Sequence, residues 1–210
     1  MPELPEVETI KRDLEKVVIG KKITRVHVAN AKVIREPSLD KFKRGLSGVR
    51  INKVSRRAKV LILELSNAKS LAIHLRMTGQ LVYPGNGENA RVTFELSDGK
   101  KLDFNDQRLF GELRLLDDWR KLKFIQDLGP EPKELTLKRF KEILAAKKTK
   151  IKPLLLDQKV ISGIGNLYAA EILFRAKINP HRSARGLLSR EKERIFNAMQ
   201  EIIAEAIHYG

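Results

Sequence analysis

Hydrophobic and polar residues follow two different periods along this chain of 210 residues. In residues 5–19 the apolar positions recur at helical spacing, Pro5 suits a first turn and Gly20 follows as a stop, so the pattern predicts a helix. From residue 21 to about 116 the period becomes two, which is typical of strands with one face on a core. The strand candidates are ITRVHV, VRINKV, KVLILEL, LAIHLRM, GQLVY, RVTFEL and KKLDF. The tripeptide SDG between the last two indicates a hairpin.

The second part of the chain has a helical pattern. The segment DLGPEPKEL predicts a connector, because it is rich in Pro, Gly and polar residues. Beyond it, helical spacing predicts helices at 136–148, about 151–158, about 166–177 and 189–208. The sequence therefore predicts an α+β fold. An N-terminal antiparallel β-sandwich with an N-terminal helix would span residues 1–130, and an all-helical domain would span residues 131–210.

Composition narrows the class of partner. Lys and Arg number 42 against 26 Asp and Glu, which gives a net charge of +16. Such an excess favours a polyanion, nucleic acid first and an anionic membrane surface second. The chain has no cysteine, so disulfides, cysteine-ligated zinc and a thiol nucleophile are excluded. Apolar runs such as VLILEL are too short to span a bilayer and the N-terminus is acidic, unlike a signal peptide, so a soluble intracellular protein is expected.

The N-terminus, MPELPEVETI, concentrates acid in this basic protein. One interpretation is that Glu3, Glu6 and Glu8 complement a helix dipole. The other is chemical: removal of Met1 would leave a free secondary amine on Pro2. An α-amino group titrates near ~8 and a lysine near ~10.4, so at pH 7.4 roughly a fifth of the former and about 0.1% of the latter is unprotonated. A terminal amine is therefore the better nucleophile, and a neighbouring glutamate can transfer protons.

The segment PELPEVET resembles the N-terminus of the formamidopyrimidine-DNA glycosylase family, bacterial enzymes that remove oxidised purines from DNA. Leu4 favours this branch over the related endonuclease VIII branch, which usually has Gly there. The resemblance implies a bifunctional glycosylase and abasic-site lyase. In it Pro2 attacks the sugar C1′ and forms a Schiff base, Glu3 transfers protons and Glu6 supports the site.

Two segments further along the chain match the same family. SRRAKVLILEL could be an ordinary charged loop before a strand, but it resembles a family segment whose lysine reaches the DNA at the lesion, and this implies that role for Lys59. HLRMTG and NDQRLFGEL supply Met77, Arg108 and Phe110. Core packing is the usual role of Met and Phe. The resemblance instead implies that Met77 fills the space of a flipped nucleotide, Arg108 faces the orphaned cytosine and Phe110 wedges the opposite strand. Leu109 replaces a frequent family arginine, and His74 is expected to be structural.

The stretch DQKVISGIGNLYAAEILFRAKINPHR contains a glycine turn before a predicted helix. Gly163 and Gly165 permit the turn, Asn166 is a good cap, and free N–H groups at such a helix start can bind phosphate. A purely structural helical hairpin is the alternative. The stretch resembles the family's helix-two-turn-helix, here about residues 151–181, and the resemblance implies phosphate binding by Lys159, Gly165 and Asn166.

The family normally continues with a zinc finger that holds four cysteines, and the 210 residues contain none, so no metal or other cofactor is expected. The expected partner is double-stranded DNA with oxidised purines or abasic sites, bound by a cytoplasmic bacterial monomer with no membrane contact. Two other hypotheses stay open: a non-catalytic binder of damaged or abasic DNA, and a ribosomal-type RNA binder. Only the enzyme needs Met1 removed and Pro2 free.

Overall fold

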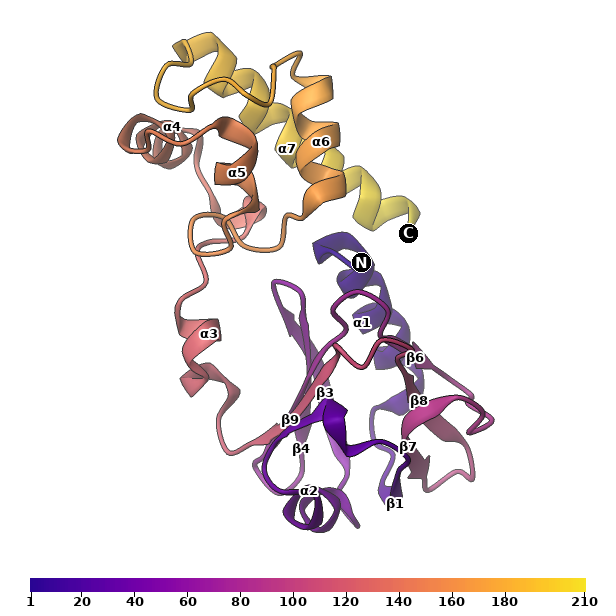
Figure 1. Cartoon of the computed structure of the whole chain (residues 1–210). Coiled ribbons are helices and arrows are strands. Elements are labelled where there is room, and N and C mark those ends of the chain that lie inside the picture. Colours follow the sequence, from indigo (N-terminus) through magenta and orange to yellow (C-terminus); the bar gives the residue numbers. More distant parts are fainter. The chain divides into compact units, whose positions relative to one another are not determined.

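The alternating residues of the first part form two β-sheets, and the residues that follow form a bundle of helices (Figure 1). The computed structural model describes residues 1–210 and divides them into two units. The β unit comprises residues 1–2 and 7–122, and the helical unit comprises residues 3–6 and 123–210. Residues 3–6 therefore group with the helical unit, although residues 4–6 belong to the first helix, whose other residues lie in the β unit.

The elements follow one another as an N-terminal helix, a strand-rich stretch and a helical stretch. The strands are β1 (Ile23–Val28), β2 (Ile34–Glu36), β3 (Ile51–Arg57), β4 (Val60–Leu65), β5 (Ser70–His74), β6 (Gln80–Val82), β7 (Ala90–Leu96), β8 (Lys101–Asn105) and β9 (Glu112–Leu116). The helices are α1 (Leu4–Val18), α2 (Leu39–Leu46), α3 (Lys123–Gln126), α4 (Leu137–Ala146), α5 (Ile151–Leu156), α6 (Asn166–Arg175) and α7 (Ser189–Tyr209). Short 3-10 turns are η1 (Ala31–Val33), η2 (Trp119–Lys121) and η3 (Pro132–Glu134).

The β unit is a two-sheet sandwich. One sheet has the strand order β1-β7-β8-β6, and the other has the order β2-β9-β5-β4-β3. All pairs are antiparallel except β2 with β9, which is parallel. Side chains from both sheets, from α2 and from α1 after its first turn form one hydrophobic core. The predicted α+β class and the predicted sandwich are confirmed. The parallel pairing of β2 with β9 was not predicted.

Two glycines explain how the chain turns at the end of α1 and between two of the strands. Gly20 has φ of 81° and ends α1, as its position after the apolar stripe predicts. Gly99 has φ of 80° in the SDG turn, and its N–H donates to the carbonyl of Leu96 at 2.9 Å. This turn joins β7 to β8, so the predicted hairpin is confirmed.

The helical unit has its own core, formed by side chains of α4 to α7, the loops between them and Leu4. Thr136 caps α4, since its hydroxyl accepts the N–H of Arg139 at 3.2 Å. The four helices predicted beyond residue 135 are present within a few residues of the expected bounds. No helix is both long and apolar enough to cross a membrane.

Candidate active site

Glu3 is almost fully buried, with 3% of its surface exposed. Its carboxylate accepts the backbone N–H of Gly165 at 2.6 Å and that of Leu167 at 3.0 Å, and the N–H of Tyr168 lies at 3.4 Å. These donors form the first turn of α6, where N–H groups lack intrahelical partners and the helix dipole favours a negative charge. The carboxylate of Glu3 therefore takes the place of a capping side chain at the N-terminus of α6.

The two glycines before α6 make room for the N-terminal residues. A Cβ atom on Gly165 would lie 2.3 Å from the carboxyl carbon of Glu3. A Cβ atom on Gly163 would lie 2.4 Å from Cδ1 of Leu4, and Gly163 has φ of 94°, a conformation that other residues rarely adopt. The side chains of Glu3 and Leu4 therefore require glycine at both of these positions in the segment ISGIGN.

The structure corrects the expected role of Asn166 as a helix cap. Gly165 occupies the N-cap position, no side chain of the cap residue makes a capping bond, and Asn166 is the exposed first residue of α6. The expectation of free N–H groups at the start of α6 is also corrected, because the carboxylate of Glu3 already accepts three of these groups. The acidic N-terminus was the only sequence signal for this pairing. Which helix it would cap depends on a contact across more than 160 residues.

Glu6 has two partners within the helical unit. One carboxylate oxygen accepts the backbone N–H of Glu3 at 2.8 Å, and the other accepts the hydroxyl of Tyr168 at 2.5 Å. Burial, and then the hydrogen bond to Glu6, raise the pKa of Tyr168 well above its ordinary value. The phenol therefore stays protonated and remains a donor at any physiological pH. Sequence analysis did not single out Tyr168, because nothing local to it indicates a carboxylate partner.

Pro2, the residue before Glu3, is half-buried, while Met1 is 54% exposed. The amide nitrogen that Glu6 binds belongs to the peptide bond between Pro2 and Glu3. Glu6 therefore fixes the backbone next to Pro2, the predicted nucleophile, at the amide nitrogen of Glu3.

Lys59 lies at the turn between β3 and β4 and is buried, with 8% of its surface exposed. Ala58 before it has a positive φ of 49°, and its carbonyl accepts a hydrogen bond from Arg56 at 2.9 Å. Arg56 also donates to Glu8 at 2.9 Å. Burial opposes ionisation of Glu8, but the hydrogen bond and charge of Arg56 hold the pKa of this carboxyl below its ordinary value. The Glu8–Arg56 pair thus connects α1 to the turn that carries Lys59.

The residues expected to fill a void in DNA lie on two exposed loops of the β unit. Met77 is 46% exposed and Phe110 is 48% exposed, and the guanidinium of Arg108 lies 4.7 Å from the centre of the Phe110 ring. Core packing, the usual role of Met and Phe, therefore does not describe them. The buried carboxylate of Asp106, which sequence analysis missed, joins the loops by accepting the hydroxyl of Thr78 and the N–H groups of Arg108 and Gly111.

His74 is the last residue of β5, and Arg76 follows it by two residues. Burial, and then the charge of Arg76, lower the pKa of His74 to about 4, so the ring is neutral at neutral pH. Its Nδ1 accepts the N–H of Arg76 at 3.1 Å. These contacts agree with the expectation that His74 is structural.

Lys159 lies in the loop between α5 and α6, and 73% of its side chain is exposed. Its ammonium is 3.5 Å from a carboxylate oxygen of Asp127. Within the helical unit the structure therefore brings together Glu3, Glu6, Gly165 and Tyr168, and leaves Lys159 and Asn166 exposed to solvent.

Comparison with known proteins agrees with these two units. Residues 1–113 match the model of the formamidopyrimidine-DNA glycosylase N-terminal domain, and residues 128–210 match that of the formamidopyrimidine-DNA glycosylase H2TH domain. The chain belongs to the formamidopyrimidine-DNA glycosylase family. The resemblance seen in the N-terminal sequence and in the helix-two-turn-helix is thereby confirmed.

Individual relatives cover almost the whole chain. A formamidopyrimidine-DNA glycosylase of Pelotomaculum thermopropionicum is 48% identical over 99% of this chain and 78% of its own length, and one of Herpetosiphon aurantiacus is 40% identical over 100% and 79%. The enzyme of Lactococcus lactis in a non-covalent complex with DNA containing an abasic site has a TM-score of 0.90 at 32% identity, over 98% of this chain and 82% of that one. The protein of Thermus thermophilus has a TM-score of 0.87 at 36% identity, over 99% and 76%.

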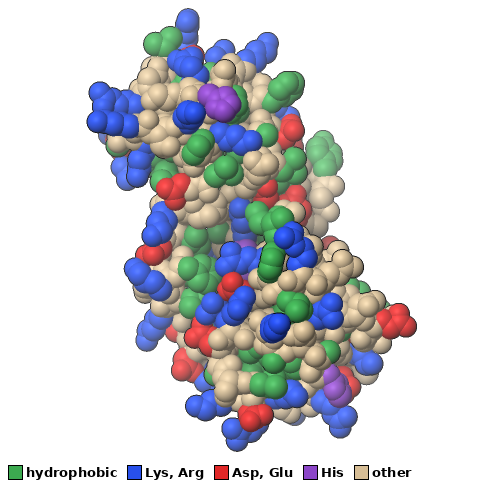
Figure 2. Space-filling view, viewed as in Figure 1, with side chains coloured by type: hydrophobic (Ala, Val, Ile, Leu, Met, Phe, Trp, Pro, Cys, Tyr) green, Lys and Arg blue, Asp and Glu red, His purple; other side chains and the backbone are tan.

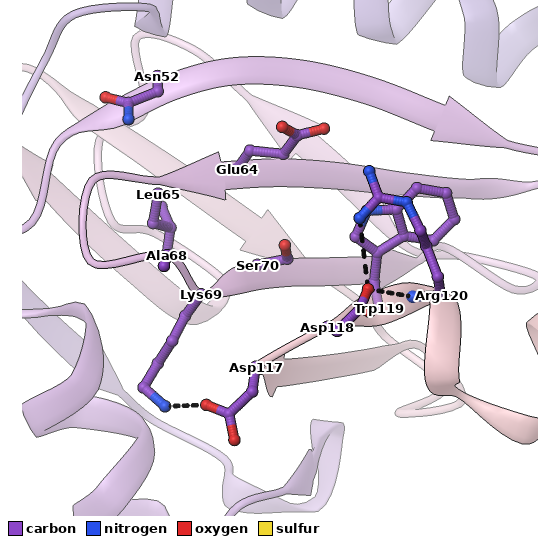
Figure 3. Close-up of a pocket in the computed structure, with 10 residues that line it drawn as sticks. All are labelled: Asn52, Glu64, Leu65, Ala68, Lys69, Ser70, Asp117, Asp118, Trp119 and Arg120. Atoms are coloured by element: carbon purple, nitrogen blue, oxygen red, sulfur yellow. Dashed lines mark hydrogen bonds and ion pairs between the residues drawn. The ribbon is translucent and has the colours of Figure 1, made fainter.

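A polar pocket of about 330 Å³ lies elsewhere on the β unit of this formamidopyrimidine-DNA glycosylase family member (Figure 3). Four of its charged residues pair with one another, Lys69 with Asp117 and Arg120 with Asp118, and the fifth, Glu64, accepts the hydroxyl of Ser55 at 3.3 Å. It contains none of the predicted site residues. No group of three or more His, Asp or Glu side chains is arranged to hold a metal ion.

Proposed function

We propose that this chain is a bifunctional DNA glycosylase and abasic-site lyase that removes oxidised purines, 8-oxoguanine and formamidopyrimidines, from duplex DNA. The observation that carries the proposal is the anchoring of Glu3, next to Pro2, at the N-terminus of α6. A carboxylate that is buried, fixed by backbone donors and adjacent to the chain's terminal amine suits proton transfer at the sugar that the amine attacks.

In the proposed reaction, Met1 is first removed by hydrolysis. The nitrogen of Pro2 then forms a bond to C1′ and loses its proton, while the glycosidic bond breaks and its electron pair leaves with the base, which takes up a proton. Opening of the sugar ring moves a second electron pair to the ring oxygen, which is protonated, and leaves an iminium between Pro2 and C1′. Loss of the C2′ proton then expels the 3′ phosphate, and hydrolysis of the iminium frees the amine. Glu3 transfers the protons at the ring oxygen.

The other predicted residues have roles in binding. Lys59 reaches the DNA at the lesion, and Glu6 supports the site. Met77 and Phe110 replace the stacking that a flipped nucleotide removes, and Arg108 faces the orphaned base. Their exposure on neighbouring loops supports this proposal. Lys159 and Asn166 are proposed to bind phosphates through their exposed side chains. The phosphate-binding role expected of Gly165 is not part of the proposal, because Gly165 is buried and its N–H already donates to Glu3.

Borohydride trapping tests the proposal, because it reduces an iminium to a stable amine. We expect the purified chain, with Met1 removed, to form a covalent complex with a duplex that contains an abasic site. Mass spectrometry of the digested complex should place the adduct on Pro2. A form that retains Met1, and the Pro2→Gly variant, should trap far less.

Two outcomes would contradict the proposal. If the chain binds the abasic duplex with Met1 removed and forms no adduct, it is a non-catalytic binder of damaged DNA. If the adduct persists in the Pro2 variants and disappears in Lys59→Ala, the nucleophile is Lys59.

A further inference from the structure

Tyr168 is the one side chain of α6 that bonds to the acidic N-terminus. Its hydroxyl donates to Glu6 at 2.5 Å, and the same carboxylate accepts the N–H of Glu3 at 2.8 Å through its other oxygen. The N–H of Tyr168 lies 3.4 Å from the carboxylate of Glu3. A single residue therefore contacts both predicted active-site glutamates, one through its side chain and the other through its backbone.

The hydroxyl decides how Glu6 is oriented. A carboxylate that accepts one donor on each oxygen has little freedom to rotate, and hydrogen bonds to ionised groups are stronger than those between neutral groups. Tyr168 is itself fixed, because its ring is buried in the core of the helical unit. Without the hydroxyl, Glu6 would keep the N–H of Glu3 but lose the contact that ties it to α6.

The position of Glu6 matters because of the atom that it holds. The amide nitrogen of Glu3 is part of the peptide bond that follows Pro2, so its fixation limits where the terminal amine can lie. A displacement on the order of 1 Å at a reacting group can reduce a rate by about a hundredfold. We propose that Tyr168 is a positioning residue, which acts through Glu6 to hold the peptide that carries Pro2. This inference rests on the proposed function, in which Pro2 is the nucleophile.

The Tyr168→Phe variant tests the inference, since it removes the hydroxyl and keeps the buried ring. We expect the single-turnover rate of borohydride-trapped adduct formation on an abasic duplex, at saturating protein, to fall roughly tenfold, the effect of one hydrogen bond to a charged group. The Kd for the same duplex should change little, and the urea midpoint should fall only by what the loss of one hydrogen bond costs, so that the protein stays folded under the assay conditions. Tyr83→Phe is the matched control: its hydroxyl bonds to Asp98 in the β unit, so its trapping rate should equal that of the unchanged protein.

A double-mutant cycle separates positioning from packing. If Tyr168 acts through Glu6, then Tyr168→Phe should slow the Glu6→Gln variant little further, because the interaction is already altered. Fully additive losses would overturn the inference, as would a Tyr168→Phe rate equal to that of the unchanged protein. Absence of any adduct in the unchanged protein would instead overturn the proposed function.

Discussion

At the scale of single residues, the acidic N-terminus of this basic chain has a physical explanation. Glu3 accepts the N–H groups of α6, Glu6 accepts one backbone and one phenolic donor, and Glu8 pairs with a buried arginine. Each carboxylate thus has its own partners. The helix-dipole interpretation is right for Glu3 in kind, but the helix concerned is α6 and not the one that begins at Leu4.

Gly165→Ala should disable this arrangement, because the new methyl group would lie 2.3 Å from the carboxyl carbon of Glu3. We expect it to slow adduct formation at least tenfold and to reduce the free energy of unfolding by about 1–3 kcal/mol, as overpacking does. Trapping kinetics and urea denaturation measure the two effects. Gly186→Ala is the control, since the atoms nearest its Cβ lie at 3.7 and 3.8 Å. Equal behaviour of the two variants would show that Glu3 can move aside without loss.

At the scale of elements, the sequence predicted what local patterns determine. The apolar stripe of α1, the SDG hairpin and the helices beyond residue 135 are all specified by neighbouring residues. The helix α2 was missed because it has only eight residues inside a region of period two. The strand β2 was missed because its three residues are ordered by parallel pairing with β9, nearly 80 residues later, and β9 itself was not singled out. Predicted site residues followed from motifs, whereas Asp106 and Tyr168 are recognisable only from long-range contacts.

The contact of α1 with β3 also predicts a dependence of stability on pH. Arg56 has a side chain that is 4% exposed, and Glu8 balances its charge. Glu8→Gln should therefore reduce the free energy of unfolding by about 3 kcal/mol at pH 7, since it removes one partner of a buried pair. Because the pKa of Glu8 in the folded state lies below 4.5, the unfolded state takes up the proton first as pH falls. The difference between the two proteins should then shrink below about pH 4.5.

Urea denaturation at pH 7 and at pH 4 measures this difference. Asp13→Asn is a control on the same helix, because Asp13 and its partner Lys16 are 67% and 71% exposed. Exposed pairs contribute about 0–1 kcal/mol, so this variant should be nearly neutral at both pH values. A Glu8→Gln protein as stable as Asp13→Asn would mean that the buried arginine is satisfied without Glu8.

At the scale of the whole molecule, the excess of basic residues bears on the proposed binding of DNA. Lys and Arg side chains are spread over the visible face of both units, and Asp and Glu side chains are scattered among them (Figure 2). A net charge of +16 attracts any polyanion, so affinity alone does not identify the binding surface. The dependence of affinity on salt is more informative, because each phosphate contact contributes about 0.9 to the slope of log K against log salt.

Lys159→Ala should lower this slope by about 0.9 and weaken binding to damaged and undamaged duplexes alike, because phosphate contacts carry no sequence information. Lys123→Ala is a closely matched control. Both lysines are exposed, both approach the carboxylate of Asp127, at 3.5 Å from Lys159 and 2.8 Å from Lys123, and both changes remove one positive charge. Only Lys159 lies in the loop before α6, where phosphate binding is proposed. Fluorescence anisotropy at several salt concentrations should therefore give a reduced slope for Lys159→Ala and an unchanged slope for Lys123→Ala. Equal reductions in both would mean that total charge, and not the position of Lys159, sets the binding, and a loss confined to one lesion would assign Lys159 to base recognition.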